Sequence, residues 1–225
     1  MTRAPDTLES LHDGFAFGIL HRRPAGECRG GVVLLHEIFG LDGYMRADAE
    51  RYATAGFEVI APSLFDRASP GFAAAHDPAG IKEGFRLVQQ TALDAAMGDI
   101  SACVQELRRR GPAYMVGYCY GGRLVWQASA QIAGVRAAAC YYGQIAPLAE
   151  LAPHCPVICH FARKDGHIDA DATHAAISAA HPEIPFHIYE NSGHGFNNDG
   201  AVDADPADAT LARARTLALF AAHAD

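Results

Sequence analysis

The sequence predicts an α/β protein with a mostly parallel central sheet and helices on both faces of that sheet. Short apolar, β-branched runs alternate with longer stretches of helical periodicity along all 225 residues. Half of the residues are hydrophobic and 20% are charged, which is typical of a folded chain with a full-sized core. Neither a linker composition nor an internal repeat interrupts this alternation. We therefore expect one domain over residues 1–225.

The expected strands are short apolar runs. The clearest is Gly31–Leu35, which is apolar throughout, as is typical of a strand buried on both faces of a parallel sheet. Residues 14–20 form the opening strand and are a candidate for an antiparallel edge. Further strands are expected at residues 57–61, 114–116, 135–142, 156–161 and 186–190.

Helical periodicity fills the intervals between these strands. It predicts a helix over residues 44–55, with Gly56 as the C-terminal cap, and a long helical region over residues 81–110 that is broken near Gly98. The last helix is expected to begin with Asp205 as N-cap and Pro206 as its first residue. Shorter helices are expected at residues 123–131 and 170–180. Residues 62–80 form a long loop, and loops of this length are often functional.

Charge and cysteine content restrict the partners and the compartment. The 18 basic and 26 acidic residues give a formal charge of −8, and the one basic cluster, residues 108–110, is expected to face water at a helix end. We therefore expect no nucleic-acid partner. No apolar run approaches the length of a membrane span, and residues 1–14 are too polar for a signal peptide. The six cysteines are accordingly expected as free thiols in the cytoplasm.

Residues 117–122, Gly-Tyr-Cys-Tyr-Gly-Gly, have the context of a nucleophile elbow, because they follow an apolar strand and precede a helix. The nucleophile of such a turn has a strained backbone, and its neighbours must be small, as Gly117 and Gly121 are. The N-terminus of the following helix would favour a thiolate and a developing oxyanion. We predict that Cys119 is a nucleophile; the alternative is a glycine-rich turn with a buried cysteine.

Two further residues follow in the order nucleophile, acid, histidine. Asp165 comes directly after one predicted strand, and His194 directly after the next. The carboxyl ends of strands are where α/β sheets place their sites. The histidine would act as base and then as acid, and the aspartate would orient it. Asp169 is an alternative acid, although it is also suited to cap the next helix.

The segment 36–40, His-Glu-Ile-Phe-Gly, follows the first buried strand. A loop there would supply a second oxyanion-hole amide beside the amide of Tyr120. Glu37 either faces the nucleophile or is a solvated loop carboxylate. No metal site and no cofactor are expected, because the regularly spaced histidines fall on different elements. These histidines are His160, His167, His174 and His181.

Together these segments resemble the dienelactone hydrolase (carboxymethylenebutenolidase) family, cysteine-dependent members of the α/β-hydrolase superfamily. The resemblance extends from about Gly31 to the final helix and implies the α/β-hydrolase fold. It is carried by residues 36–40, 64–71, 117–122, 164–165 and 193–196. It implies a catalytic triad and an oxyanion hole formed by two backbone N–H groups, and it implies that Glu37 contacts the nucleophile at rest and helps to generate the thiolate. The triad would be Cys119, Asp165 and His194, and the two N–H groups those of Ile38 and Tyr120.

The resemblance also places Arg67 where the family has an arginine that pairs with a substrate carboxylate, a task that suits its bidentate fork. The family's second such arginine lies four residues after the histidine, where this chain has Asn198. We therefore expect a hydrolase that cleaves a small ester or lactone through an acyl-cysteine intermediate. A carboxylesterase for uncharged esters is the alternative, and a non-catalytic ligand-sensing scaffold is a third. A monomer is compatible with the sequence.

Overall fold

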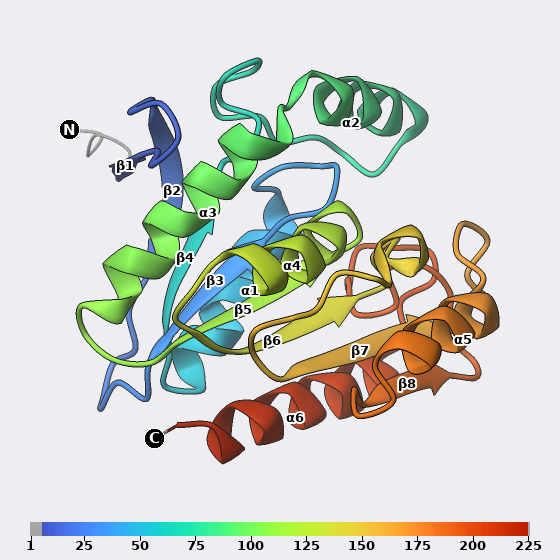
Figure 1. Ribbon diagram of the computed structural model, residues 1–225. Helices are drawn as coiled ribbons and strands as arrows, with labels where there is room; N and C mark the ends of the chain where they lie inside the picture. Colours follow the sequence, from blue (N-terminus) through green and yellow to red (C-terminus); the bar gives the residue numbers. More distant parts are fainter. Residues whose placement is uncertain (1–5, 225) are drawn as a thin grey trace. The chain divides into compact units, whose positions relative to one another are not determined.

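The computed structural model describes residues 6–224, and its eight strands form a mostly parallel sheet with helices, the α/β-hydrolase fold (Figure 1). The first five residues of the polar N-terminal segment lie outside this description. The chain divides into two compact units, one up to Tyr114 and one from Met115, with the boundary inside β5. The expectation of one domain over residues 1–225 stays a prediction.

In the first unit the strand order is β1-β2-β4-β3. The β1–β2 and β2–β4 pairs are antiparallel, and the β4–β3 pair is parallel. Every residue of β3 is buried, as predicted for a strand covered on both faces. Every residue of β4 is buried too, and α1 and α3 both contact this strand. The elements of this unit are β1 (Thr7–Glu9), β2 (Ala16–Arg22), β3 (Gly31–Leu35), α1 (Gly43–Thr54), β4 (Glu58–Pro62), α2 (Pro78–Gln90) and α3 (Leu93–Arg108).

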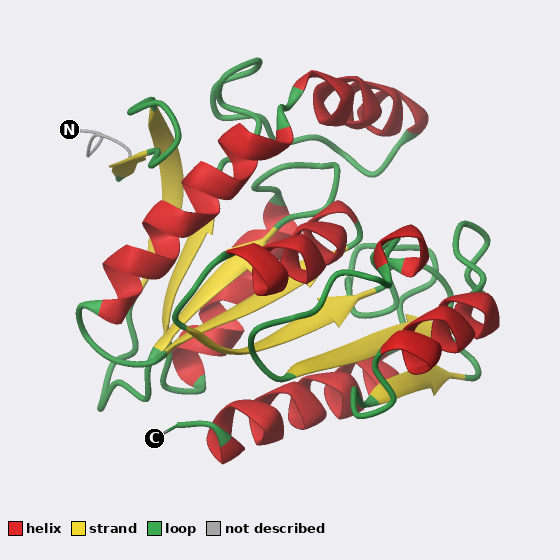
Figure 2. Ribbon diagram, in the orientation of Figure 1, coloured by secondary structure: helices red, strands yellow, loops and turns green. Residues whose placement is uncertain are grey.

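In the second unit the strands follow the order β5-β6-β7-β8, and both the β6–β7 and the β7–β8 pairs are parallel. Helix α4 contacts β6, and α6 contacts β6 and β7 (Figure 2). The turn after β5 and the loops after β7 and β8 hold the three predicted triad residues. The elements are β5 (Ala113–Tyr118), α4 (Tyr120–Gln131), β6 (Val135–Tyr141), a 3₁₀ turn (Ala146–Leu148), β7 (Val157–Ala162), α5 (Ala170–Ala180), β8 (Phe186–Tyr189) and α6 (Pro206–Ala222).

The break in the long predicted helix lies at residues 91–92, between α2 and α3, and the expectation of a break near Gly98 is wrong. Gly98 lies inside α3, where a β-carbon would come within 2.5 Å of the His12 side chain. The N–H of Leu11 donates to the carbonyl oxygen of Gly98 at 3.2 Å. This glycine therefore allows the β1–β2 connection to approach the helix closely, and it does not end the helix.

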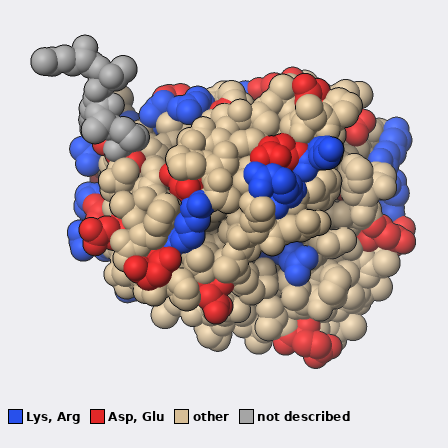
Figure 3. All heavy atoms as spheres, turned by 90° about the horizontal axis from the view of Figure 1, so that it is seen from above, with Lys and Arg blue, Asp and Glu red and all other residues tan. Residues whose placement is uncertain are grey.

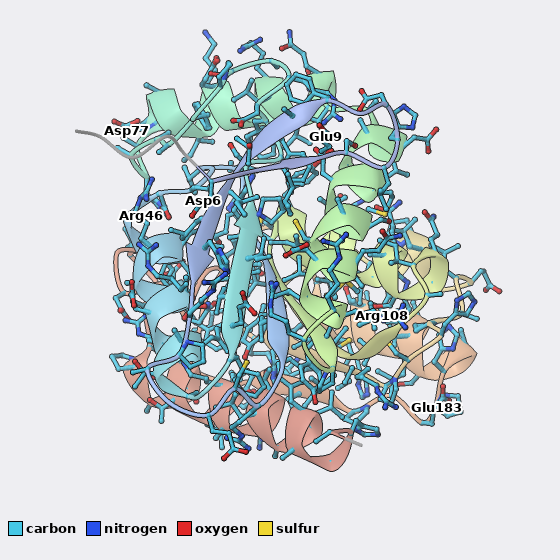
Figure 4. The ribbon with its side chains drawn as sticks, turned by 90° about the vertical axis from the view of Figure 1, so that its left-hand side faces the viewer. Asp6, Glu9, Arg46, Asp77, Arg108 and Glu183 are labelled. Atoms are coloured by element: carbon cyan, nitrogen blue, oxygen red, sulfur yellow. The ribbon has the colours of Figure 1, made fainter. Side chains whose placement is uncertain are left out.

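The predicted N-cap of the last helix is present, and α2 has a cap of the same kind. Asp205 accepts hydrogen bonds from the N–H groups of Ala207 and Asp208, and Pro206 is the first residue of α6. Asp77, labelled beside α2 in Figure 4, caps that helix. Helix α4 begins at Tyr120, three residues earlier than predicted, although its first turn contains two glycines, which have low helix propensity.

Charged residues on the face in Figure 3 are interspersed, acidic with basic. The basic cluster at residues 108–110 is only partly directed to water. Arg108 ends α3 (Figure 4), but Arg110 pairs with Glu58, whose side chain is 5% exposed, at 2.7 Å. A buried carboxylate such as that of Glu58 requires a cationic partner, and the sequence did not predict that Arg110 is this partner. Among residues 6–224, no helix is both long and apolar enough to cross a membrane.

Candidate active site

Cys119 occupies the turn between β5 and α4 (Figure 1), with φ 52° and ψ −110°. Only two non-glycine residues of the described chain have a positive φ, and Cys119 is one of them. Its N–H donates to the carbonyl oxygen of Tyr141 at 3.0 Å, and its own carbonyl oxygen accepts from the N–H of Arg123 at 3.1 Å. A residue with a β-carbon keeps this conformation only where its surroundings enforce it. The geometry is that of the predicted nucleophile elbow.

The glycines of this turn are required by close backbone contacts. A β-carbon at Gly117 would lie 2.2 Å from the carbonyl oxygen of Gly121, and one at Gly122 would lie 2.5 Å from that of Tyr141. Neither position has room for a side chain. The close backbone packing at these glycines lets α4 begin immediately after Cys119. The Cys119 side chain is partly exposed.

His194 and Asp165 meet on the loops that follow β8 and β7. The His194 Nδ1–H donates to Asp165 Oδ2 at 2.7 Å, and the Asp165 side chain is 1% exposed. The other oxygen, Oδ1, accepts from the N–H groups of His167 and Ile168 at 2.8 and 3.0 Å. Both carboxylate oxygens are thus engaged, which fixes the carboxylate plane and through it the imidazole.

His194 also forms a hydrogen bond with Cys119, so the three predicted triad residues lie in one hydrogen-bonded chain within the second unit. The alternative acid, Asp169, instead caps α5 by accepting from the N–H of Ala172 at 2.9 Å. The geometry therefore brings Asp165, and not Asp169, to the histidine.

The hydrogen bonds among these residues shift the pKa values of both His194 and Asp165 toward their charged forms. Burial alone would lower the pKa of His194, but its hydrogen bonds to Asp165 and Cys119 raise that pKa to about 10. Burial raises the pKa of Asp165, yet the bond from His194 and the two backbone N–H groups outweigh it and lower the pKa overall. His194 is therefore protonated at neutral pH.

Tyr142 contacts this site and was not found from the sequence. Its ring packs edge-on against that of His194, with ring centroids 4.8 Å apart, and it is the second non-glycine residue with a positive φ, at 33°. His167 packs on the same imidazole at 5.1 Å. The signal in the sequence was weak, because Tyr142 only continues an apolar strand. Its place at the carboxyl end of β6 is what brings it to the histidine.

The segment 36–40 follows β3 in the first unit, as predicted. Glu37 is 6% exposed and Ile38 is 7% exposed. Glu37 is therefore not a solvated loop carboxylate. Ile38 belongs to the first unit and Tyr120 to the second, and their role as oxyanion donors remains a prediction.

Arg67 has two intramolecular carboxylate partners, and its pairing with a substrate carboxylate stays a prediction. Its Nη1 and Nη2 donate to Asp99 at 2.6 and 3.1 Å, and its Nε and Nη2 donate to Asp13 at 3.3 and 2.8 Å. The guanidinium also lies over the Phe15 ring, 4.6 Å from its centroid. Asp99 is fully buried, and a buried carboxylate requires a cation. Asp99 raises the pKa of Arg67 by hydrogen bonding, against the effect of burial.

Asn198 is also fully buried, and its contact with a substrate stays a prediction. Its Oδ1 accepts from the N–H of Gly200 at 2.9 Å, and its backbone N–H donates to the carbonyl oxygen of Gly195 at 2.8 Å. These bonds order the turn that follows His194. Within residues 6–224, no three His, Cys, Asp or Glu side chains are grouped as metal ligands.

Comparison with known proteins identifies the family of this chain. The model of the dienelactone hydrolase family matches residues 17–224. A carboxymethylenebutenolidase from Pseudomonas putida is 29% identical over 222 residues, which cover 93% of each chain. A crystal structure assigned as a dienelactone hydrolase from Klebsiella pneumoniae subsp. pneumoniae MGH 78578 has a TM-score of 0.82 at 24% identity, covering 97% of this chain and 99% of that chain.

A second solved structure, the dienelactone hydrolase-like promiscuous phosphotriesterase P91 from metagenomic libraries, has a TM-score of 0.75 at 16% identity and covers 98% of both chains. These structural likenesses concern the fold. The family match spans nearly the whole chain, including every predicted site residue. The chain belongs to the dienelactone hydrolase family and is a hydrolase of esters or lactones.

Proposed function

We propose that the chain cleaves a small ester or lactone through a covalent acyl-cysteine intermediate. The Cys119 thiolate attacks the carbonyl carbon, and the imidazolium of His194 gives its proton to the departing alkoxide. Water then attacks the thioester while neutral His194 accepts a proton from it, which releases the acid and leaves the thiolate beside the imidazolium. Return of this proton to the sulfur restores the resting thiol. Asp165 keeps the imidazole in one orientation through both steps. The observation that carries this proposal is the hydrogen-bonded chain from Cys119 through His194 to Asp165 at a strained turn.

The tetrahedral intermediates of both steps need donors for the oxyanion. We assign the backbone N–H groups of Ile38 and Tyr120 to this task, on the strength of the family and of their positions directly after β3 and directly after the nucleophile. Burial of Glu37 supports a place for its carboxylate beside the resting thiol. There it would help to generate the thiolate when a substrate binds.

The substrate has two candidate classes. Membership of the family favours a carboxylated, dienelactone-like lactone. The bonds of Arg67 to Asp13 and Asp99 favour the second class, uncharged esters, because its guanidinium donors are already occupied by carboxylates. Asn198 is buried and uncharged, so it cannot form an ion pair with a substrate carboxylate. This also favours uncharged esters.

Replacement of Cys119 tests the mechanism. Cys119→Ala should abolish turnover of a phenyl ester, because triad members act as a unit worth several orders of magnitude. Cys155→Ala is the matched control: burial raises the pKa of that thiol to about 11, so it is inert, and its loss should leave turnover nearly unchanged. Near-normal turnover by Cys119→Ala would refute the mechanism.

Paired substrates test the substrate class. Each carboxylated lactone is compared with a neutral analogue of the same ring and leaving group. If uncharged esters are the substrates, kcat/KM should be at least as high for the neutral member of each pair. A consistent preference for the carboxylated member would assign the dienelactone-like class.

A further inference from the structure

His36, the residue before Glu37, is fully buried and makes two hydrogen bonds that require opposite roles of its ring nitrogens. Nδ1 lies 2.5 Å from the carbonyl oxygen of Glu37, which can only accept. Nε2 lies 3.3 Å from the backbone N–H of Leu64, which can only donate. A neutral imidazole with its proton on Nδ1 satisfies both. Burial lowers the pKa of His36 to about 4, so this neutral form is the one present at physiological pH.

The bond from His36 sets the direction of the Ile38 N–H. The carbonyl of Glu37 and the N–H of Ile38 belong to the same peptide unit, and none of the described peptide bonds is cis. In a planar trans peptide these two groups point in opposite directions. A carbonyl held against the His36 ring therefore turns the N–H of Ile38 away from that ring.

The next peptide unit is held by α2. A β-carbon at Gly84 would lie 2.3 Å from the carbonyl oxygen of Ile38 and 2.9 Å from its side chain. The helix backbone thus lies directly on the Ile38–Phe39 peptide, and only glycine permits this approach. Two backbone hydrogen bonds to the long loop between β4 and α2 hold the next residues. The Ala74 N–H donates to the carbonyl oxygen of Phe39 at 3.0 Å, and the Leu41 N–H donates to that of Phe72 at 3.3 Å.

We propose that His36 and Gly84 are positioning residues that hold the two peptides flanking Ile38 in one orientation, and so keep the Ile38 N–H directed as an oxyanion donor. The inference rests on the proposed function, which gives this N–H its role. His36 opposes a flip of the first peptide because the flip would break its bond to Glu37. Gly84 leaves the second peptide no space on the side of α2.

Gly84→Ala tests the contact with α2. Alanine is the better helix former, so the helix itself should not suffer. Displacement of the Ile38–Phe39 peptide should lower kcat for a phenyl ester by about ten- to a hundred-fold, which is less than the loss expected when one oxyanion donor is removed completely. KM should change by less than about threefold. Alkylation of Cys119 by iodoacetamide should keep its rate, because displacement at a saturated carbon forms no oxyanion. Gly43→Ala, where a β-carbon meets no atom within 4 Å, is the matched control and should retain full turnover.

A pair of His36 variants tests the ring. His36→Asn places an amide N–H near the former Nδ1 and should keep more turnover than His36→Phe, which fills the space without a donor. Both should alkylate at the wild-type rate. If Gly84→Ala and His36→Phe slow alkylation as much as turnover, they disturb the triad or the fold, and the inference is wrong.

The inference and the proposed function fail in different ways. Full turnover by Gly84→Ala and His36→Phe, beside an inactive Cys119→Ala, would overturn the inference alone. An active Cys119→Ala would overturn the proposed function and the inference with it.

Discussion

Replacing Arg67 with alanine should destabilise the protein through Asp99 rather than alter its choice of substrate. Asp99 is fully buried, and Arg67 binds both of its carboxylate oxygens. Removal of one partner from a buried ion pair leaves an uncompensated charge, which costs about 3–5 kcal/mol. In a chain of this size each kcal/mol lowers Tm by about 2–4 °C, so we expect a loss of about 6–20 °C.

Thermal unfolding of three variants is the assay. Arg86 makes a similar bidentate pair with Glu83, but on the exposed face of α2, so Arg86→Ala should leave Tm nearly unchanged. Combining Arg67→Ala with Asp99→Leu removes the buried charge together with its partner and should recover much of the lost stability. An unchanged Tm for Arg67→Ala, with kcat/KM lost only on carboxylated lactones, would refute this reasoning and make Arg67 the substrate clamp.

Three further predictions concern the triad, the resting thiol and acid stability. Asp165→Asn should cut turnover by about a thousandfold or more and lower the pKa of His194 from about 10, which NMR titration would report. Asp169→Asn changes only the cap of α5 and should cost at most about 1 kcal/mol in urea unfolding. Glu37→Gln should lower turnover and remove any acceleration of thiol alkylation by a substrate analogue; equal alkylation with and without the analogue in the wild type would exclude this role. His36 has a pKa of about 4 folded against 6.5 unfolded, so up to about 3 kcal/mol of stability should be lost as pH falls from 6.5 to below 4, and unfolding of His36→Phe should lack this loss.

Residues that act through their sequence neighbours were predictable. The turn at Cys119 was identified because its glycines, the strand before it and the helix after it are contiguous in sequence. The cap at Asp205 is equally local, since it bonds the N–H groups two and three residues on. Asp165 and His194 were found because each follows a strand directly, and parallel strands gather their carboxyl ends at one edge.

Residues that act through distant partners were not predictable. Arg67 binds Asp13 and Asp99, which are 54 and 32 residues away, and no spacing rule links them. The role of Gly98 depends on the approach of His12 from another element, so a helix-propensity argument misread it as a break. The family resemblance implies that Arg67 binds a substrate carboxylate. It gives no information on the buried Asp99 carboxylate, to which the Arg67 guanidinium donates in the structure.

The most direct test of the acyl-cysteine mechanism is intact-mass spectrometry of the enzyme quenched in acid during turnover of an activated phenyl ester. The mechanism predicts one added acyl group, mapped by peptide analysis to Cys119, that decays at the rate of turnover. The adduct should be absent from Cys119→Ala and present in Cys155→Ala. An acyl group on a different residue, or undiminished turnover by enzyme whose Cys119 has been alkylated, would contradict the account.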